Sequence, residues 1–204
     1  MIKLYGCGTP NGRKVSIAME ELALPYEIHL IDIMKGEQFT KEFLAINPNN
    51  KIPAIVDDEG PDGKSITLFE SGAILVYLAN KTGRLMPAVG SAYFRTMQWL
   101  MFQMGGVGPM LGQMHHFKRY AKDQTYSLTR YTTETHRLYK VLDGQLEKHQ
   151  FIAGNDYSIA DIAIFPWIAR FELHDIEWSS VPNVKRWYDI VGARSAVKRG
   201  MEAL

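Results

Sequence analysis

The segment YGCGTPNGRK, residues 5–14, contains the first side chains that could do chemistry. Cys7 is the single cysteine of the chain, and Thr9 and Asn11 belong to the turn that follows it and opens into a predicted helix. A thiolate is a nucleophile, whereas hydroxyl and amide donors at a helix N-terminus stabilise a thiolate that a ligand brings. The segment therefore offers two chemistries, attack by Cys7 or activation of a bound thiol by Thr9 and Asn11.

Cys7 precedes the turn by two residues and ends the first predicted strand. A cysteine in such a place is more often a small buried apolar side chain than a nucleophile. We therefore expect Cys7 to serve packing. A single cysteine also excludes an intramolecular disulfide and a zinc site of several thiolates, and it is typical of a reducing compartment.

The segment PNNKIPAIVDD, residues 48–58, has a proline at the start of a predicted strand. If the peptide bond between Ile52 and Pro53 is cis, the backbone N–H and C=O of Ile52 turn outward. These groups would then pair with an extended peptide-like ligand, as an added strand does. An ordinary proline of an edge strand explains the same residues equally well.

The segment FESGAI, residues 69–74, joins a predicted strand to a predicted helix. Ser71 fits the N-cap position, and the N–H groups beside it form a small anion site that the helix dipole assists. Glu70 offers a carboxylate to an ammonium group. A carboxylate receptor beside an ammonium receptor suits the head group of an α-amino acid, although an ordinary helix cap with a surface glutamate also fits this stretch.

Three further motifs carry no chemistry in our interpretation. Ser158 and Asp161 stand in the relation of a capping box, which starts a helix. His115 and His116 are neighbours that diverge on a helix and have no third ligand at a suitable spacing, so we expect no metal. The glycines of GGVGP do not open a helix as a nucleotide loop does, and they are expected to mark a kink or close packing.

The elements that must position these residues change in kind near the middle of the chain. Up to residue 83 the pattern alternates, with strands expected at 2–7, 26–33, 52–58 and 65–70. A strand–helix–strand unit followed by a hairpin and a helix is the thioredoxin-like pattern. Beyond it only helices are expected, at 92–120, 126–149, 158–173 and 182–194. The predicted domains are an α/β thioredoxin-like domain, 1–82, and an all-α domain, 91–204.

The composition is that of an ordinary globular protein, with 46% hydrophobic and 22% charged residues. A net charge of +1 gives no indication of nucleic-acid or membrane-surface binding. The sequence has no apolar run of membrane-spanning length and no signal peptide at its start. We therefore expect a soluble, cytoplasmic protein.

Five motifs in order resemble the cytosolic glutathione transferase superfamily, and within it the nu class of disulfide-bond oxidoreductases. They cover essentially the whole chain: GTPNGRKVSI, NPNNKIPAI, LFESGAILVYLA, GGVGPMLGQMHHF and YSIADIAIFPW. The resemblance implies the glutathione transferase fold, a homodimer, and glutathione as a bound co-substrate without a metal. In the nu class the Thr-Pro-Asn turn, here with Thr9 and Asn11, replaces the Tyr, Ser or Cys that activates the thiol in other classes.

The resemblance also implies which residues bind glutathione. Ile52 would pair with the cysteinyl backbone, and Glu70 and Ser71 would hold the γ-glutamyl ammonium and carboxylate. Other polar groups of the tripeptide, including its glycine carboxylate, would fall to Gln38 and Lys51. Asn11 of the turn and Arg130 of the helical part would also bind glutathione.

The main functional hypothesis is a glutathione-dependent reductase of small disulfides. A second hypothesis is conjugation of glutathione to electrophiles, with Thr9 or Tyr5 as the activator. A third is a glutathione-binding regulatory protein without turnover. The combination of Thr9, Asn11, Ile52, Glu70 and Ser71 favours catalysis over the third.

Overall fold

The first strand shows how the sheet gains a buried face. β1 (Ile2–Gly6) buries Ile2 and Leu4, while Lys3 and Tyr5 stay partly exposed. Successive side chains of a strand point to opposite faces, so this alternation gives one face of the sheet to a core. The computed structural model, which describes residues 1–204, adds three strands: β2 (Tyr26–Leu30), β3 (Ala54–Asp57) and β4 (Ile66–Phe69).

The four strands form one mixed sheet in the order β2-β1-β3-β4. β1 is parallel to β2 and antiparallel to β3, and β3 is antiparallel to β4. The parallel pair requires a crossover, which α1 (Pro10–Leu22) provides, whereas the turn at η2 (Pro61–Gly63) closes the hairpin of β3 and β4. The predicted thioredoxin-like pattern is confirmed.

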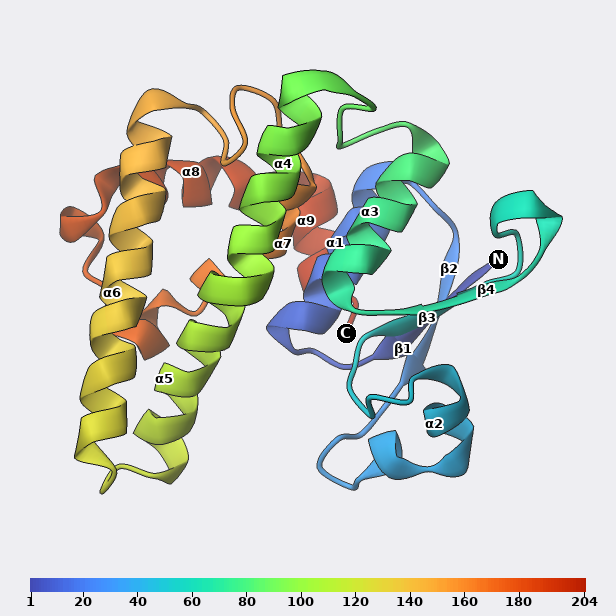
Figure 1. Ribbon diagram of the computed structural model, residues 1–204, viewed down its shortest axis with the longest axis horizontal. Helices are drawn as coiled ribbons and strands as arrows, with labels where there is room; N and C mark the ends of the chain where they lie inside the picture. Colours follow the sequence, from blue (N-terminus) through green and yellow to red (C-terminus); the bar gives the residue numbers. More distant parts are fainter. The chain divides into compact units, whose positions relative to one another are not determined.

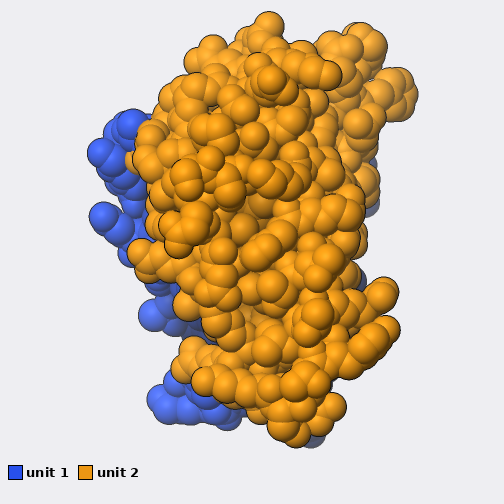
Figure 2. All heavy atoms as spheres, turned by 90° about the vertical axis from the view of Figure 1, so that its left-hand side faces the viewer, with its two compact units in different colours: residues 1–86, 193–204 blue, residues 87–192 orange.

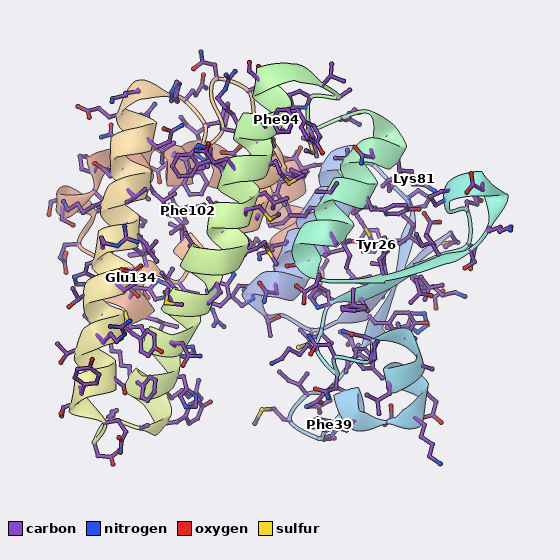
Figure 3. All side chains as sticks on the ribbon, viewed as in Figure 1. Tyr26, Phe39, Lys81, Phe94, Phe102 and Glu134 are labelled. Atoms are coloured by element: carbon purple, nitrogen blue, oxygen red, sulfur yellow. The ribbon has the colours of Figure 1, made fainter.

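Helices cover both faces of this sheet. Figure 1 shows α1 and α3 (Ser71–Thr82) on one side and the short α2 (Lys41–Ile46), which follows the 3₁₀ turn η1 (Glu37–Phe39), on the other. The fully buried apolar side chains of α1, α3 and the sheet include Leu4, Val15, Ile17, Ile55, Leu75 and Leu78. Lys81, at the C-terminal end of α3, is labelled in Figure 3, and its Nζ lies 2.7 Å from the buried carboxylate of Asp57.

A helix near the end of the chain, α9 (Ser195–Glu202), packs along α1 and was not predicted. A β-carbon at Gly200 would lie 2.5 Å from Ile17 Cα, so a glycine is required for the two backbones to come this close. Ser16 Oγ donates to Gly200 O at 2.6 Å. Two ion pairs, each with an N–O distance of 2.6 Å, add to this packing: Arg194 with Glu21, and Arg199 with Glu20.

The remaining elements are helical, as predicted. They are α4 (Gly90–Phe102), the π-helical turn η3 (Gln103–Val107), α5 (Gly108–Tyr120), α6 (Thr125–Lys148), α7 (Ile159–Ile168), the 3₁₀ turns η4 (Phe171–His174) and η5 (Trp178–Ser180), and α8 (Pro182–Gly192). The capping box of α7 is confirmed, with Ser158 N–H donating to Asp161 Oδ2 at 2.9 Å. The predicted helix at 158–173 is too long, because the α-helix ends at Ile168 and a 3₁₀ turn follows.

The chain forms two compact units, which Figure 2 distinguishes by colour. One consists of Met1–Met86 together with Ala193–Leu204, and the other of Pro87–Gly192. The first unit consists of two separate segments, whereas the domains expected from the sequence, 1–82 and 91–204, are each continuous. The division into those two domains stays a prediction.

Two kinds of feature are not found among the 204 residues. No helix has both the length and the apolar character needed to cross a membrane. No group of three or more His, Cys, Asp or Glu side chains is arranged to hold a metal ion. Of the adjacent histidines of α5, His116 packs edge-on against Phe117 with 5.4 Å between the ring centroids.

Candidate functional site

Thr9 lies in the turn between β1 and α1, where it caps the helix. Its backbone is extended (φ −84°, ψ 161°), and its Oγ1 accepts a hydrogen bond from the Gly12 N–H at 3.3 Å. Pro10 follows at the first helical position, where an N–H has no intrahelical partner. A hydroxyl that accepts the capping hydrogen bond still has a proton to donate. Thr9 can therefore cap α1 and donate to a ligand at the same time.

Cys7 connects β1 to this turn, and its side chain is half-buried. A β-carbon at Gly12 would lie 2.3 Å from Cys7 O, so the carbonyl and the helix start are in tight contact. Burial raises the pKa of the Cys7 thiol, and the Thr9 N–H offsets only part of this rise. Because the thiolate is the nucleophile, a raised pKa makes Cys7 less reactive at neutral pH. This favours the interpretation that Cys7 does not react.

The corner between β4 and α3 holds Glu70 and Ser71. The prediction that Ser71 is the N-cap is wrong, because Ser71 is the first helical residue and Glu70 occupies the cap position without a side-chain hydrogen bond. Glu70 has φ 68° and ψ 111°, a backbone conformation that residues other than glycine rarely adopt. Such strain costs about 1–3 kcal/mol and is found mainly at functional sites.

The peptide bond between Ile52 and Pro53 is cis. The ladder that joins β3 to β1 begins at Ala54, which pairs with Tyr5. The backbone N–H and C=O of Ile52 therefore lie outside the sheet ladder. This is the arrangement that the pairing of Ile52 with a peptide-like ligand requires.

One pocket of the first unit is lined by the start of α1, the loop before β3 and the start of α3, and its volume is about 100 Å³. Its lining residues are Asn11, Asn47, Lys51, Ile52, Pro53, Glu70 and Ser71. The structure thus brings together five residues that were predicted from the sequence: Asn11, Lys51, Ile52, Glu70 and Ser71. They offer an amide, an ammonium, backbone groups, a carboxylate and a hydroxyl at the start of α3. Such a set suits a small ligand that carries both charges.

Two residues of this site were missed in the sequence. Asn47 is buried, and its Nδ2 donates to Lys51 O at 2.5 Å, which holds the loop that leads into Ile52. Lys14 of α1 is also buried, and its Nζ donates to Ser71 Oγ at 3.2 Å. A signal for Lys14 was present, because residues three and four positions further along a helix share its face, and at Lys14 these are Ile17 and Ala18.

Gln38 does not line the pocket and lies on η1. Its Nε2 donates to Ile33 O at 3.3 Å, while its Oε1 is buried without a hydrogen-bond partner. Buried polar atoms are nearly always hydrogen-bonded, so an unpartnered acceptor needs an explanation. A donor on a bound ligand would provide one.

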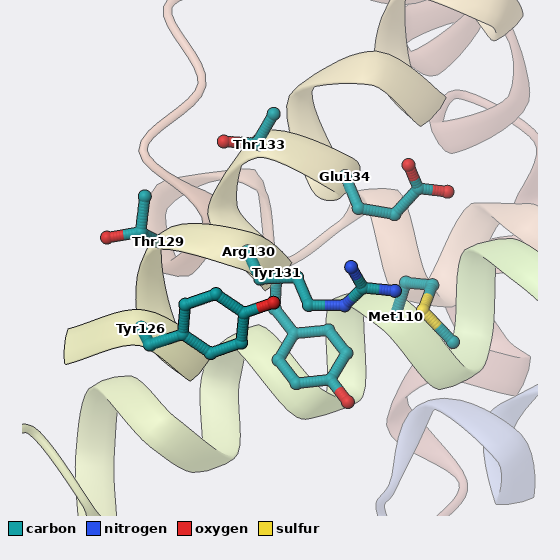
Figure 4. A pocket seen from close by; sticks show the side chains of 7 residues that line it. All are labelled: Met110, Tyr126, Thr129, Arg130, Tyr131, Thr133 and Glu134. Carbon is teal, nitrogen blue, oxygen red and sulfur yellow. The ribbon is translucent and has the colours of Figure 1, made fainter. Parts of the chain in front are cut away.

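Arg130 lies on α6 and is not among the residues that line the pocket of the first unit. It lines a pocket of about 540 Å³ in the helical unit, together with Met110, Tyr126, Thr129, Tyr131, Thr133 and Glu134. In Figure 4 its side chain extends along this pocket toward Met110. Arg137 hydrogen-bonds the Glu134 carboxylate at 2.7 Å and lowers its pKa, and Arg130 adds a smaller effect in the same direction. The contact of Arg130 with glutathione stays a prediction.

Comparison with known proteins identifies the family. The chain matches "Glutathione S-transferase, N-terminal domain" over residues 9–81 and "Glutathione S-transferase, C-terminal domain" over residues 107–194. Disulfide-bond oxidoreductase YfcG of Escherichia coli (strain K12) is 47% identical over 204 residues, which cover 98% of this chain and 94% of YfcG. The chain belongs to the glutathione transferase superfamily.

Solved structures of glutathione transferases are similar along the whole chain. A family member from Pseudomonas fluorescens Pf-5, with two glutathione molecules bound, is 48% identical with a TM-score of 0.94, covering 98% of this chain and 92% of that chain. A glutathione transferase from Pseudomonas putida, with one glutathione disulfide bound per subunit, is 43% identical with the same TM-score of 0.94, covering 98% and 90% of the two chains. The glutathione transferase fold predicted from the sequence is confirmed.

Proposed function

We propose that this glutathione transferase superfamily member is a glutathione-dependent disulfide oxidoreductase that reduces small disulfides. The observation that carries the proposal is the pocket around Ile52, Glu70 and Ser71, whose polar groups match those of glutathione. The similarity to YfcG, which is named a disulfide-bond oxidoreductase, supports the reaction type. The bound glutathione and glutathione disulfide of the two Pseudomonas proteins support the ligand.

The residues of the first unit can be assigned to the successive parts of glutathione. Glu70 would bind the γ-glutamyl ammonium, and Ser71 at the N-terminus of α3 would bind the neighbouring carboxylate. Ile52 would pair with the cysteinyl backbone through its N–H and C=O. Lys51 would bind the glycine carboxylate, and Gln38 would approach another polar group of the tripeptide. Arg130 would add a cation from the helical unit.

Thr9 and Asn11 would act on the sulfur of the bound tripeptide. A thiol with an ordinary pKa of about 8.5 is mostly protonated at neutral pH. The Thr9 hydroxyl and the Asn11 amide would donate to the thiolate, and the N-terminus of α1 adds positive potential in the same place. A pKa near the ambient pH, rather than far below it, gives the fastest disulfide exchange.

The reaction moves two electrons from glutathione to the substrate. Two glutathione thiols lose two electrons and two protons and become joined by an S–S bond, while the S–S bond of the substrate breaks and yields two thiols. Thr9 and Asn11 hold the attacking sulfur as thiolate, and Ile52 fixes its backbone. Cys7 would not take part, because burial raises the pKa of its thiol and so lowers the fraction present as thiolate.

We further propose that the protein is a cytoplasmic homodimer. The superfamily resemblance implies the dimer, and a chain with one cysteine suits the reducing conditions that keep glutathione in its thiol form. Analytical ultracentrifugation of the purified chain tests the dimer directly. A monomer at micromolar concentration would contradict it.

A coupled assay tests the proposed reaction. The purified protein is mixed with glutathione, a small symmetrical dialkyl disulfide, glutathione reductase and NADPH, and NADPH consumption is followed. We expect turnover above the uncatalysed rate, and we expect Thr9→Ala and Asn11→Ala each to lower kcat/KM about tenfold, the value of one hydrogen bond to a charged group. Absence of catalysed turnover, or faster conjugation of an aromatic halide than disulfide reduction, would contradict the proposal.

A matched control separates loss of a cap from loss of catalysis. Thr40 caps α2 as Thr9 caps α1, since its Oγ1 accepts from the Phe43 N–H at 3.3 Å. Thr40→Ala therefore removes the same kind of hydrogen bond away from the pocket, and its kcat/KM should stay near that of the unchanged protein. Thr9→Ser keeps the hydroxyl and should retain most of the activity.

A further inference from the structure

Lys14 places an amino group in the interior of the first unit. Lysine side chains are almost never fully buried unless they are paired. Lys14 is only 1% exposed, on the α1 helix that packs against α3, and its Nζ donates to Ser71 Oγ at 3.2 Å. Because Ser71 also lines the pocket, the ammonium of Lys14 stands directly behind one wall of the proposed binding site.

The direction of this hydrogen bond matters for a ligand. An ammonium group only donates, so the Ser71 hydroxyl accepts from Lys14 and its own proton is a donor for another acceptor. Ser71 is also the first residue of α3, where the helix dipole is positive. The ammonium behind Ser71 and the helix end beside it both favour a negatively charged group in this part of the pocket.

The charged groups around Lys14 are distributed unevenly. Glu70, at the start of α3, is the charged group that acts on it and favours its protonated form. The other cations and carboxylates on the elements packed against α1 are Lys3 of β1, Lys81 of α3, and Lys198, Arg199 and Glu202 of α9. Of these, Lys81 is bound to Asp57, and Arg199 is bound to Glu20.

We propose that Lys14 is a positioning residue for the carboxylate of the ligand's amino-acid head group, and that binding is coupled to the uptake of a proton by Lys14. The inference rests on the proposed function and deepens it. Lys14 holds Ser71 from the interior and supplies the charge opposite the carboxylate, while Glu70 faces the ammonium. The ammonium of the head group then pairs with Glu70. The carboxylate of the head group interacts with Lys14 through the Ser71 hydroxyl, which lies between them.

The coupling follows from the state of Lys14 in the free protein. Burial lowers the pKa of Lys14 to about 7, and Glu70 offsets part of this shift. A carboxylate on the other side of Ser71 favours the ammonium and raises that pKa. At a pH between the pKa of Lys14 in the free protein and its higher pKa in the complex, the free protein holds a neutral amine and the complex an ammonium. Binding then takes up a proton. The affinity should therefore fall as the pH rises above about 7.

Calorimetry with S-methylglutathione, which has no thiol to titrate, tests this coupling. Binding is measured about one pH unit above the pKa of free Lys14, in phosphate and in Tris, whose ionisation enthalpies differ. The unchanged protein should take up a substantial fraction of a proton. Lys14→Met should lose that uptake and bind about tenfold more weakly. Lys14→Arg, whose charge does not titrate, should bind without uptake.

A control at the opposite end of α3 distinguishes positioning from general stability. Lys81→Met also removes a lysine bound to another residue of the first unit, and it should leave both the affinity and the proton uptake unchanged. Absence of uptake by the unchanged protein, or equal affinity and uptake in Lys14→Met, would overturn the role of Lys14 alone. No binding of S-methylglutathione to the unchanged protein would overturn the proposed function as well.

Discussion

Two helix N-termini border the pocket of the first unit, and they are built differently. At α1, Thr9 has an ordinary extended backbone and closes the helix with its own hydroxyl. At α3, the cap position belongs to Glu70, whose side chain makes no capping hydrogen bond and whose backbone has φ 68°. The first arrangement stabilises its helix. The second destabilises the protein and leaves the carboxylate of Glu70 without a capping role, so that it can bind a ligand.

The difference indicates a division of labour within one site. The start of α1 offers small donors, from Thr9 and Asn11, that suit a single sulfur atom. The start of α3 offers the carboxylate of Glu70 and the hydroxyl of Ser71, to which Lys14 of α1 donates, and this set suits a zwitterionic head group. The α3 end should therefore govern affinity, and the α1 end should govern the rate of the chemical step.

The largest expected effect is on affinity at the α3 end. Glu70→Ala removes the proposed partner of the ligand ammonium, and the dissociation constant for glutathione should rise about tenfold to a hundredfold, as for the loss of a hydrogen bond between charged groups. Thr9→Ala should change the same constant much less while lowering kcat. Isothermal titration and steady-state kinetics on both variants provide the comparison, and the reverse pattern would exchange the roles of the two ends.

A smaller effect concerns stability, and here the two ends should respond with opposite signs. Thr9→Ala loses the α1 cap and should lower the free energy of unfolding by about 1 kcal/mol. Glu70→Gly places the residue that tolerates positive φ at a strained position, and it should raise that free energy by up to about 1 kcal/mol while abolishing tight binding. Urea unfolding measures both, and a Glu70→Gly protein less stable than Thr9→Ala would argue against strain at this corner.

The smallest effect should come from Cys7, although it lies in the same turn as Thr9. Cys7→Ala removes a thiol whose pKa burial has raised, so the reductase kcat/KM should stay within about twofold of the original. The coupled assay described above measures it. A tenfold loss would assign the chemistry to the protein's own sulfur and remove the distinction between the two helix ends.

Local patterns were enough to predict much of the fold and of the site. The alternation of β1, the capping box of Ser158 and Asp161, and the proline after Ile52 each depend on residues within a few positions of one another. Such features are set by short stretches of sequence. The cluster of Ile52, Glu70 and Ser71 was anticipated because the resemblance to the glutathione transferase superfamily implied it.

The features that were missed depend on contacts between distant segments. The helix face of Lys14 indicates its burial, but its hydrogen-bond partner Ser71 lies far along the chain and has no local signal. The positive φ of Glu70, which moved the start of α3, is fixed by the surrounding fold and not by the sequence FESG. The packing of α9 on α1 depends on the fit of Gly200 against Ile17. The amphipathic pattern of either helix does not indicate that these two residues meet.

The contact of α9 with α1 has a consequence for the order of events during synthesis. Residues 193–204 belong to the first unit, although 87–192 form the other unit between its two parts. A ribosome therefore releases β1 to α3 long before the helix that covers α1. The intervening helical unit is complete in sequence first, whereas the first unit acquires α9 only after the whole helical unit has been made.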